Sequence, residues 1–124
     1  MLAIPEEGLR FLIVDDEMIV ALDLEDMLTE LGHQVVETAS RVPHGLEIAR
    51  TCDLDMAILD INVRGVMSFP IATILRERGV QIIFASGYGE QGLIDGFRDA
   101  HVLTKPFDLD DLARVVAKAR VHAN

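Results

Sequence analysis

Five short apolar runs recur along the chain, and most of them end on acidic or hydroxyl side chains. Runs of this length predict β-strands, and the most continuous of them predict strands that are buried on both faces. Between the runs, apolar residues return every three or four positions, which is typical of amphipathic helices. The pattern predicts strands over residues 9–14, 33–38, 55–60, 80–85 and 102–104.

Turn and capping residues indicate where the helices begin and end. Ser68 is a candidate N-cap, and Gly32 and Gly79 suit the left-handed position that ends a helix. A further helix over residues 88–99 would contain three glycines, each costing about 1 kcal/mol relative to Ala, so we expect it to be short, irregular or mobile. The other predicted helices cover residues 18–31, 40–50, 68–78 and 108–121.

Strands that alternate with helices predict a three-layer α/β sandwich with a parallel sheet. Right-handed crossovers and the size of the chain favour the flavodoxin-like (βα)5 arrangement, with strand order 2-1-3-4-5. Residues 1–8 are interpreted as a short N-terminal lead, and residues 9–124 as one domain. We expect no output domain, because the last predicted helix uses up the chain.

The charge balance narrows the classes of function. The 21 Asp and Glu residues outnumber the 11 Lys and Arg residues, which gives a formal net charge of −10 at pH 7. An acidic surface disfavours nucleic acid and anionic membranes as partners, since both attract clustered basic residues. No apolar run approaches the roughly 20 residues of a membrane span, and no signal peptide is visible. We therefore expect a cytoplasmic protein with no nucleic-acid partner and no membrane insertion.

Polar side chains stand at the C-terminal ends of four predicted strands. In the order 2-1-3-4-5 these four strands are neighbours, so their end residues can share one cleft. An acid at a strand end is also a common helix cap, but the convergence of three acids with a lysine favours a binding site. The set comprises Asp15 and Asp16 after the first strand, Asp60 at the end of the third, Ser86 directly after the fourth and Lys105 directly after the fifth.

Three neighbouring carboxylates repel one another and raise each other's pKa. A hard divalent cation relieves this repulsion, and Mg²⁺ suits a site with two carboxylates, a backbone carbonyl and several waters. One oxygen of Asp60 then stays free to attack a phosphoryl group and to carry an aspartyl phosphate. Lys105 supplies a cation for the new anion, and Ser86 supplies a hydroxyl.

The motifs at these strand ends, in chain order, are Val14-Asp15-Asp16-Glu17, Leu59-Asp60, Ala85-Ser86-Gly87 and Lys105-Pro106-Phe107. Together they resemble the receiver domain of two-component response regulators, over nearly the whole chain. The resemblance implies that the protein takes phosphate from the phosphohistidine of a histidine kinase or a phosphotransfer protein. It implies that Asp60 is the phosphoacceptor and that Mg²⁺ is the cofactor.

The resemblance also assigns roles to the residues around the phosphoacceptor. It implies that Asp16, Asp60 and the backbone carbonyl of Asn62 bind Mg²⁺ directly. It implies that Asp15 holds the metal largely through water. The Lys105–Pro106 peptide is typically cis in this family.

The run Phe84-Ala85-Ser86-Gly87-Tyr88-Gly89 resembles a narrower group, the single-domain alphaproteobacterial receivers that carry an F-A-T-G-Y-type run. This group is associated with histidine kinases of the HWE and HisKA2 types. Many receivers carry Tyr or Phe as a switch three residues before the last lysine, but this chain has Val102 there. Tyr88 is an alternative candidate for that switch. Asn62 and Tyr88 also flank the expected line of water attack, so both are candidates for tuning dephosphorylation.

Two other functions stay open. One is an interaction module with a receiver fold that does not use phosphate, an option that Val102 keeps open. The other is a phosphohydrolase with an aspartate nucleophile, but such enzymes usually carry the nucleophile on the first strand with a second Asp two residues on. The favoured hypothesis is a stand-alone receiver, a monomer or weak homodimer, that switches a protein-binding surface. It would be no enzyme beyond its own phosphotransfer and dephosphorylation.

Overall fold

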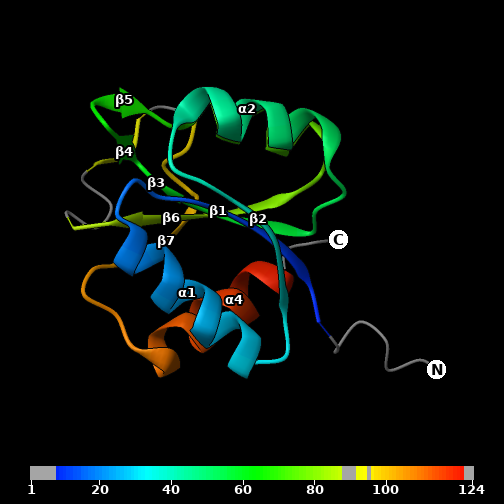
Figure 1. The fold of residues 1–124 in the computed structure, drawn as a ribbon, viewed down its shortest axis with the longest axis vertical. Coiled ribbons are helices and arrows are strands. Elements are labelled where there is room, and N and C mark those ends of the chain that lie inside the picture. The colour runs from blue at the N-terminus through cyan, green and yellow to red at the C-terminus, as the bar shows by residue number, and fades with distance from the viewer. Residues whose placement is uncertain (1–7, 88–91, 95, 122–124) are drawn as a thin grey trace.

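The computed structural model describes residues 8–87, 92–94 and 96–121 (Figure 1). The order of the main sheet is β2-β1-β3-β6-β7, and every neighbouring pair of strands is parallel. The predicted α/β fold is thereby confirmed, as is the strand order 2-1-3-4-5 when the parallel strands are counted along the chain. The five strands are β1 (Arg10–Val14), β2 (Gln34–Ala39), β3 (Met56–Asp60), β6 (Gln81–Ser86) and β7 (His101–Thr104).

Helices cover both faces of this sheet, with α2 on one side and α1 and α4 on the other (Figure 1). Ile71 of α3 packs in the same core cluster as Leu59, whereas Leu24 of α1 packs in the cluster of Ile58. Because Ile58 and Leu59 point to opposite faces and both are buried, β3 has a continuous apolar sequence. No helix in the described part of the chain is long and apolar enough to cross a membrane. The helices are α1 (Met18–Glu30), α2 (Val42–Thr51), α3 (Phe69–Glu77) and α4 (Leu109–Val121).

The helix predicted over residues 88–99 is the main error in the (βα)5 prediction. Its described part, residues 92–94 and 96–99, contains turns and no α-helix, so the described chain has four α-helices rather than five. Gly96 has a φ of +93°, which an α-helix does not accommodate. The N–H of Phe97 donates to the carbonyl of Ile94 at 3.0 Å and closes a single turn. Residues 92–94 and 96–100 are called the post-β6 segment below.

Residues 62–67, which follow β3, form a two-stranded antiparallel ribbon of β4 (Asn62–Val63) and β5 (Val66–Met67). Arg64 and Gly65 have φ values of +55° and +83°, as a type I′ turn requires. The side-chain Oδ1 of Asn62 accepts a hydrogen bond from the N–H of Gly65 at 2.7 Å. Strands of two residues carry too little pattern to be predicted from sequence.

The helix ends follow the sequence signals in part. Gly32 and Gly79 have φ values of +93° and +80°, as their positions after α1 and α3 predict. Ser68 is the N-cap residue of α3, but its hydroxyl makes no capping bond and, fully buried, finds no partner among the described residues. Its carbonyl accepts the N–H groups of Ile71 and Ala72 instead.

Candidate functional site

Three carboxylates meet at the C-terminal ends of β1 and β3. One oxygen from each of Asp15, Asp16 and Asp60 lies within 4.8 Å of the other two. Parallel pairing of β1 with β3 places Val14 opposite Leu59, so both strands deliver their following acids to the same edge of the sheet. The structure thus brings together the three acids that the sequence singled out.

Asp60 belongs to this cluster, and only 14% of its side chain is exposed. Burial is the strongest influence on its carboxyl and raises its pKa to about 6. The ion pair with Lys105 acts in the opposite direction, while the charges of Asp15 and Asp16 add to the rise. A carboxyl with this pKa is easily converted to the carboxylate by an additional cation.

Asp15 is the most buried of the three acids, with 2% of the residue exposed. Its Oδ1 accepts a hydrogen bond from the N–H of Glu17 at 2.8 Å. Its Oδ2 lies 3.5 Å from Nζ of Lys105 and receives no hydrogen bond from the described residues. Burial raises the pKa of this carboxyl. A buried carboxylate oxygen with spare lone pairs is a ready acceptor for a metal-bound water.

Asp16 is held by the ribbon that follows β3. Its Oδ2 accepts a hydrogen bond from the backbone N–H of Arg64 at 3.0 Å. The positive φ of Arg64 aims this N–H, and the bond from Gly65 to Asn62 stabilises the turn. Sequence reasoning did not detect this contact, because the two residues are 48 positions apart and the donor is main chain.

The donor set fits a magnesium ion. Three carboxylates lie close together, and the buried Oδ2 of Asp15, which pairs with Lys105 but receives no hydrogen bond from the described residues, is an acceptor that a hydrated cation would satisfy. Magnesium prefers oxygen ligands and keeps several of its waters, so a cluster of carboxylates suits it. The residues that can hold the ion are Asp15, Asp16 and Asp60.

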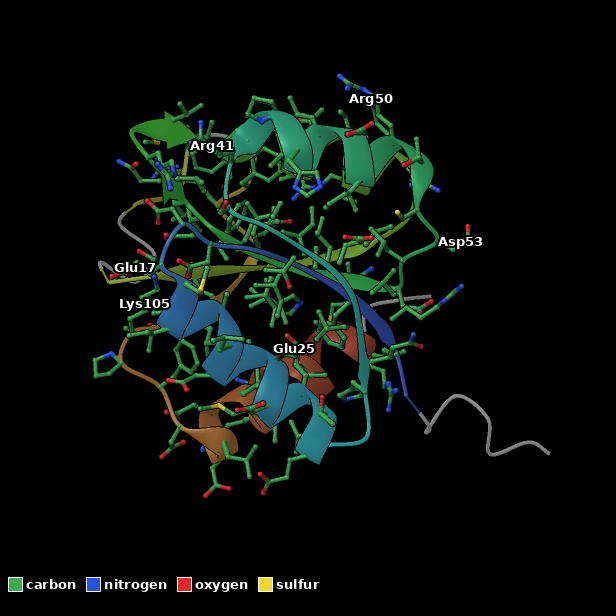
Figure 2. All side chains as sticks on the ribbon, in the orientation of Figure 1. Glu17, Glu25, Arg41, Arg50, Asp53 and Lys105 are labelled. Atoms are coloured by element: carbon green, nitrogen blue, oxygen red, sulfur yellow. The ribbon has the colours of Figure 1, made fainter. Side chains whose placement is uncertain are left out.

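Lys105 supplies the positive charge of the site. Its Nζ lies 3.6 Å from Oδ1 of Asp60, 3.5 Å from Oδ2 of Asp15 and 3.9 Å from Oε1 of Glu17. Figure 2 shows Glu17 and Lys105 side by side at the start of α1. The sequence assigned no role to Glu17, although its position directly after Asp16 could have indicated that it lies near the site. The Lys105–Pro106 peptide is cis, as the resemblance implies.

Ser86 ends β6, and only 4% of it is exposed. Its carbonyl accepts the N–H of Lys105 at 2.8 Å, which joins the ends of β6 and β7. Gly92 lies beside it: a Cβ at that glycine would be 3.7 Å from Oγ of Ser86 and 3.0 Å from Cδ1 of Ile61. The close approach of the post-β6 segment to Ser86 therefore depends on a residue without a side chain.

Val102 and Tyr88 occupy the two positions considered for the output switch. Val102 is half-buried, lies opposite Phe84 in the pairing of β6 with β7, and packs against the core cluster on that face. Its small, packed side chain cannot act as an aromatic switch. Tyr88 lies outside the described residues.

A parallel five-stranded sheet with an acid cluster, a hydroxyl and a lysine at its carboxyl edge defines an α/β domain with an acidic site that could hold a metal ion. The sequence profile of the response regulator receiver domain matches residues 11–117, and the chain belongs to this family. The predicted resemblance is therefore confirmed. Receiver domains bind Mg²⁺ at an acidic pocket and take phosphate from histidine kinases.

Solved structures support the same assignment. The solution structure of SdrG from Sphingomonas melonis Fr1 matches with a TM-score of 0.80 and 36% sequence identity, over 98% of this chain and 99% of that one. The response regulator PhyR from Brucella abortus matches with a TM-score of 0.81 and 26% identity, over 94% of this chain and 49% of that one. The near-complete coverage of SdrG agrees with the predicted resemblance to single-domain alphaproteobacterial receivers.

Curated relatives are longer proteins. The transcriptional regulatory protein TcrA from Mycobacterium tuberculosis H37Rv is 34% identical over 120 residues, which cover 91% of this chain and 47% of TcrA. The chain spans about half the length of the curated relatives it matches. The names of these relatives describe transcriptional regulatory proteins and cell cycle response regulators.

Proposed function

We propose that this chain accepts a phosphoryl group on Asp60 from the phosphohistidine of a histidine kinase or a phosphotransfer protein. The observation that carries the proposal is that Asp60 lies close to a lysine and to two other acids. Nζ of Lys105 lies 3.6 Å from Oδ1 of Asp60, and an oxygen of each of Asp15 and Asp16 lies within 4.8 Å of an oxygen of Asp60. A phosphoryl group on this carboxylate would be near both a cation and a pair of acids that could hold a metal ion.

In the proposed transfer, a carboxylate oxygen of Asp60 attacks the phosphorus atom. An O–P bond forms, the N–P bond of the phosphohistidine breaks, and its electron pair passes to the imidazole nitrogen. Lys105 pairs with the phosphoryl oxygens, and the hydroxyl of Ser86 donates a hydrogen bond to one of them. Both groups stabilise the negative charge of the phosphoryl oxygens, which the carboxylate alone would repel.

The proposed Mg²⁺ ligands are Asp16, Asp60 and the backbone carbonyl of Asn62, with Asp15 holding the ion through water. When bound, Mg²⁺ offsets the negative charge of the carboxylates and of the incoming phosphoryl oxygens. The support for these assignments is the carboxylate cluster itself and the buried Oδ2 of Asp15, which receives no hydrogen bond from the described residues. The N–H of Arg64 donates to Oδ2 of Asp16 and so restrains this carboxylate at the cluster.

Hydrolysis of the aspartyl phosphate ends the signal, and we propose that Asn62 and Tyr88 tune its rate. Asn62 is exposed and lies two residues after Asp60, close to where water would approach. The decay of the phosphoprotein is to be compared in wild type, Asn62→Ala and Tyr88→Ala. A changed half-life in either variant supports the proposal, and unchanged half-lives in both would refute it.

Signalling would pass through a surface that includes the post-β6 segment, β7 and α4. The bond between the carbonyl of Ser86 and the N–H of Lys105 couples the ends of β6 and β7, so a movement of Ser86 reaches β7 directly. The resemblance of the segment around Tyr88 favours kinases of the HWE and HisKA2 types as phosphate donors. Such a donor places the reaction in the cytoplasm, with a protein partner downstream.

The test uses amide NMR with Mg²⁺ and then beryllofluoride, which mimics an aspartyl phosphate, on wild type and Asp60→Asn. Asp53→Asn is the control, because 86% of the Asp53 side chain is exposed and it lies away from the cluster. We expect shifts around Asp60, Ser86 and Lys105 in wild type and in the control, and no beryllofluoride response in Asp60→Asn.

Two other results would change the assignment. If Mg²⁺ binds and beryllofluoride has no effect on wild type, the chain is a phosphate-independent interaction module. If the protein turns over a small phosphomonoester such as p-nitrophenyl phosphate and Asp60→Asn does not, it is a phosphohydrolase.

A further inference from the structure

Two arginines at the C-terminal end of α3 reach to different parts of the molecule. Nη1 of Arg76 donates a hydrogen bond to the carbonyl of Gly96 in the post-β6 segment, at 2.5 Å. Nη1 of Arg78 donates to the carbonyls of Ala49 and Cys52, at 2.6 and 2.9 Å, and so binds the end of α2. Each arginine ties a neighbouring piece of main chain to α3, but only Arg76 holds a segment that leads to the candidate site.

Arg76 also covers the ring of Phe97. Its Cζ lies 4.3 Å from the ring centroid, which is the geometry of a cation–π contact. Phe97 also packs in the core, with its ring centroid 5.5 Å from that of Phe69 and 5.7 Å from that of Phe84. Phe97 therefore contacts a guanidinium and two aromatic rings. We call this arrangement of Arg76, Gly96 and Phe97 the α3 anchor.

The α3 anchor connects to Ser86 by two routes. Phe84, which contacts Phe97, lies on β6 two residues before Ser86. Gly92, four residues before Gly96, lies so close to Ser86 and Ile61 that a Cβ would contact both. Since protein interiors are close-packed, a shift of Ser86 away from Gly92 opens a gap unless the post-β6 segment follows.

We propose that Arg76 is a positioning residue for the phosphoryl switch: the α3 anchor stabilises the post-β6 segment in its phosphoryl-free position and thereby opposes the shift of Ser86 toward Asp60. The inference rests on the proposed function, because it needs a phosphoryl group on Asp60 that draws Ser86. A contact present in one state and weakened in the other biases the equilibrium by its own free energy. Loosening the anchor therefore favours the phosphoryl-bound state.

The experiment measures beryllofluoride affinity at saturating Mg²⁺, by amide NMR, in wild type, Arg76→Ala and Arg78→Ala. Arg78→Ala is the matched control, because it removes a comparable clamp that holds α2. We expect Arg76→Ala to bind beryllofluoride about threefold to tenfold more tightly, the range for one exposed cation–π contact with its hydrogen bond. Mg²⁺ affinity should not change in either variant, and Arg78→Ala should bind beryllofluoride like wild type.

Phe97→Leu and Arg76→Lys define the contact itself. Phe97→Leu keeps an apolar side chain but removes the ring, so it should raise beryllofluoride affinity in the same direction. The double variant Arg76→Ala/Phe97→Leu should gain less than the sum of the single variants, because both remove one contact. Arg76→Lys keeps the charge but not the planar group, and should lie between wild type and Arg76→Ala.

The outcomes separate the anchor from the phosphoryl chemistry. If wild type responds to beryllofluoride but Arg76→Ala binds it no more tightly than Arg78→Ala does, the positioning role of Arg76 is overturned and the proposed function stands. If wild type shows no response that Asp60→Asn lacks, the proposed function fails and the anchor's role fails with it. Should Arg76→Ala prove unfolded in a thermal melt, Arg76→Lys decides: tighter binding than wild type supports the anchor, and equal binding overturns it.

Discussion

The two loops beside the acid cluster are held in different ways. The loop after β3 is closed by its own main chain, since β4 pairs with β5 and the N–H of Ser68 donates to the carbonyl of Ile61 at 2.9 Å. The post-β6 segment is held from outside, by the side chain of Arg76 and by the burial of Phe97. Main-chain pairing resists local opening better than one exposed side-chain contact does.

This difference suggests that the two sides of the site have separate roles. The β3 side presents the N–H of Arg64 to Asp16 and so fixes a prospective metal ligand. The β6 side presents Ser86 through a segment whose anchor can be released. We therefore expect changes on the β3 side to alter Mg²⁺ affinity and changes on the β6 side to alter phosphoryl affinity.

The largest expected effect is that of Lys105→Ala, which acts on both sides. Removing the cation 3.6 Å from Asp60 should weaken beryllofluoride binding by about a hundredfold or more, in line with the loss of a buried charge-assisted contact. Mg²⁺ affinity should rise, because Asp15 and Asp60 lose a competing cation. Calorimetric titration of each ligand measures both effects. Lys118→Ala, on the exposed face of α4, is the control. If Lys105→Ala lost affinity for both beryllofluoride and Mg²⁺, the prediction would be contradicted.

Asp60→Asn tests the electrostatic cost of the cluster. The pKa of Asp60 is raised to about 6, so the folded state holds this proton more tightly than the unfolded state does. The protonated carboxyl of Asp60 contributes to the stability of the folded state below about pH 4, and this contribution is lost as the pH rises through about 6. Without metal, Asp60→Asn should therefore increase the unfolding free energy at pH 7.5 by about 1–3 kcal/mol, and the gain should vanish near pH 4.

Urea denaturation in the presence of EDTA, at several pH values, measures this gain. Asp53→Asn should show no such pH-dependent gain, because its side chain is 86% exposed. Adding Mg²⁺ should make wild type more stable than Asp60→Asn, because the ion binds the native wild type, whereas the variant offers it one carboxylate fewer. An equal gain at pH 4 and pH 7.5 would show that packing, not charge, is responsible.

Gly65→Ala and Gly96→Ala compare the two sides at matched backbone cost. Both glycines have positive φ, +83° and +93°, and a Cβ at either position meets nothing within 4 Å. Each substitution should therefore cost about 1 kcal/mol of unfolding free energy from backbone strain alone. Gly65→Ala should lower Mg²⁺ affinity severalfold through Arg64 and Asp16, whereas Gly96→Ala should change only beryllofluoride affinity. The same ligand profile in both variants would remove the distinction between the sides.

The smallest expected effect is that of Asn62→Ala on stability. The variant removes the acceptor of the N–H of Gly65, but water can replace it at this exposed turn. A loss of about 0.5–1 kcal/mol of unfolding free energy is expected from denaturant melts. Asn62→Asp keeps an oxygen in the same place and should restore most of the loss. A loss as large as that of Gly65→Ala would mean that the side-chain bond, not the backbone conformation, holds the turn.

The parts of the fold that could be predicted are those with a local cause. Ile58 and Leu59 are apolar because both faces of β3 are covered. Gly32 follows α1 because glycine adopts the positive φ of this position without the strain that a side chain would add. The acid cluster followed from topology, since parallel neighbours bring their carboxyl ends together. For the same reason Asp15, Asp60 and Lys105 could be grouped before any distance was known.

The parts that could not be predicted depend on contacts between distant residues. The helix expected over residues 88–99 is replaced, where described, by turns that Phe97 and Arg76 stabilise, and neither partner signals the other in the sequence. The hydroxyl of Ser68 and the Oδ2 of Asp15, which are buried and receive no hydrogen bond from the described residues, are likewise products of packing. The main-chain donor to Asp16 leaves no sequence trace, because every residue except proline could supply an N–H.

That donor gives the molecule a built-in spectroscopic reporter. An N–H bonded to a carboxylate is strongly polarised, so the amide resonance of Arg64 depends on how much negative charge Asp16 keeps. A cation on the cluster would draw that charge away and move the resonance, whether or not Asp60 carries a phosphoryl group. One titrated sample would then report metal occupancy at Arg64 and phosphoryl occupancy at Ser86 as two separate readings.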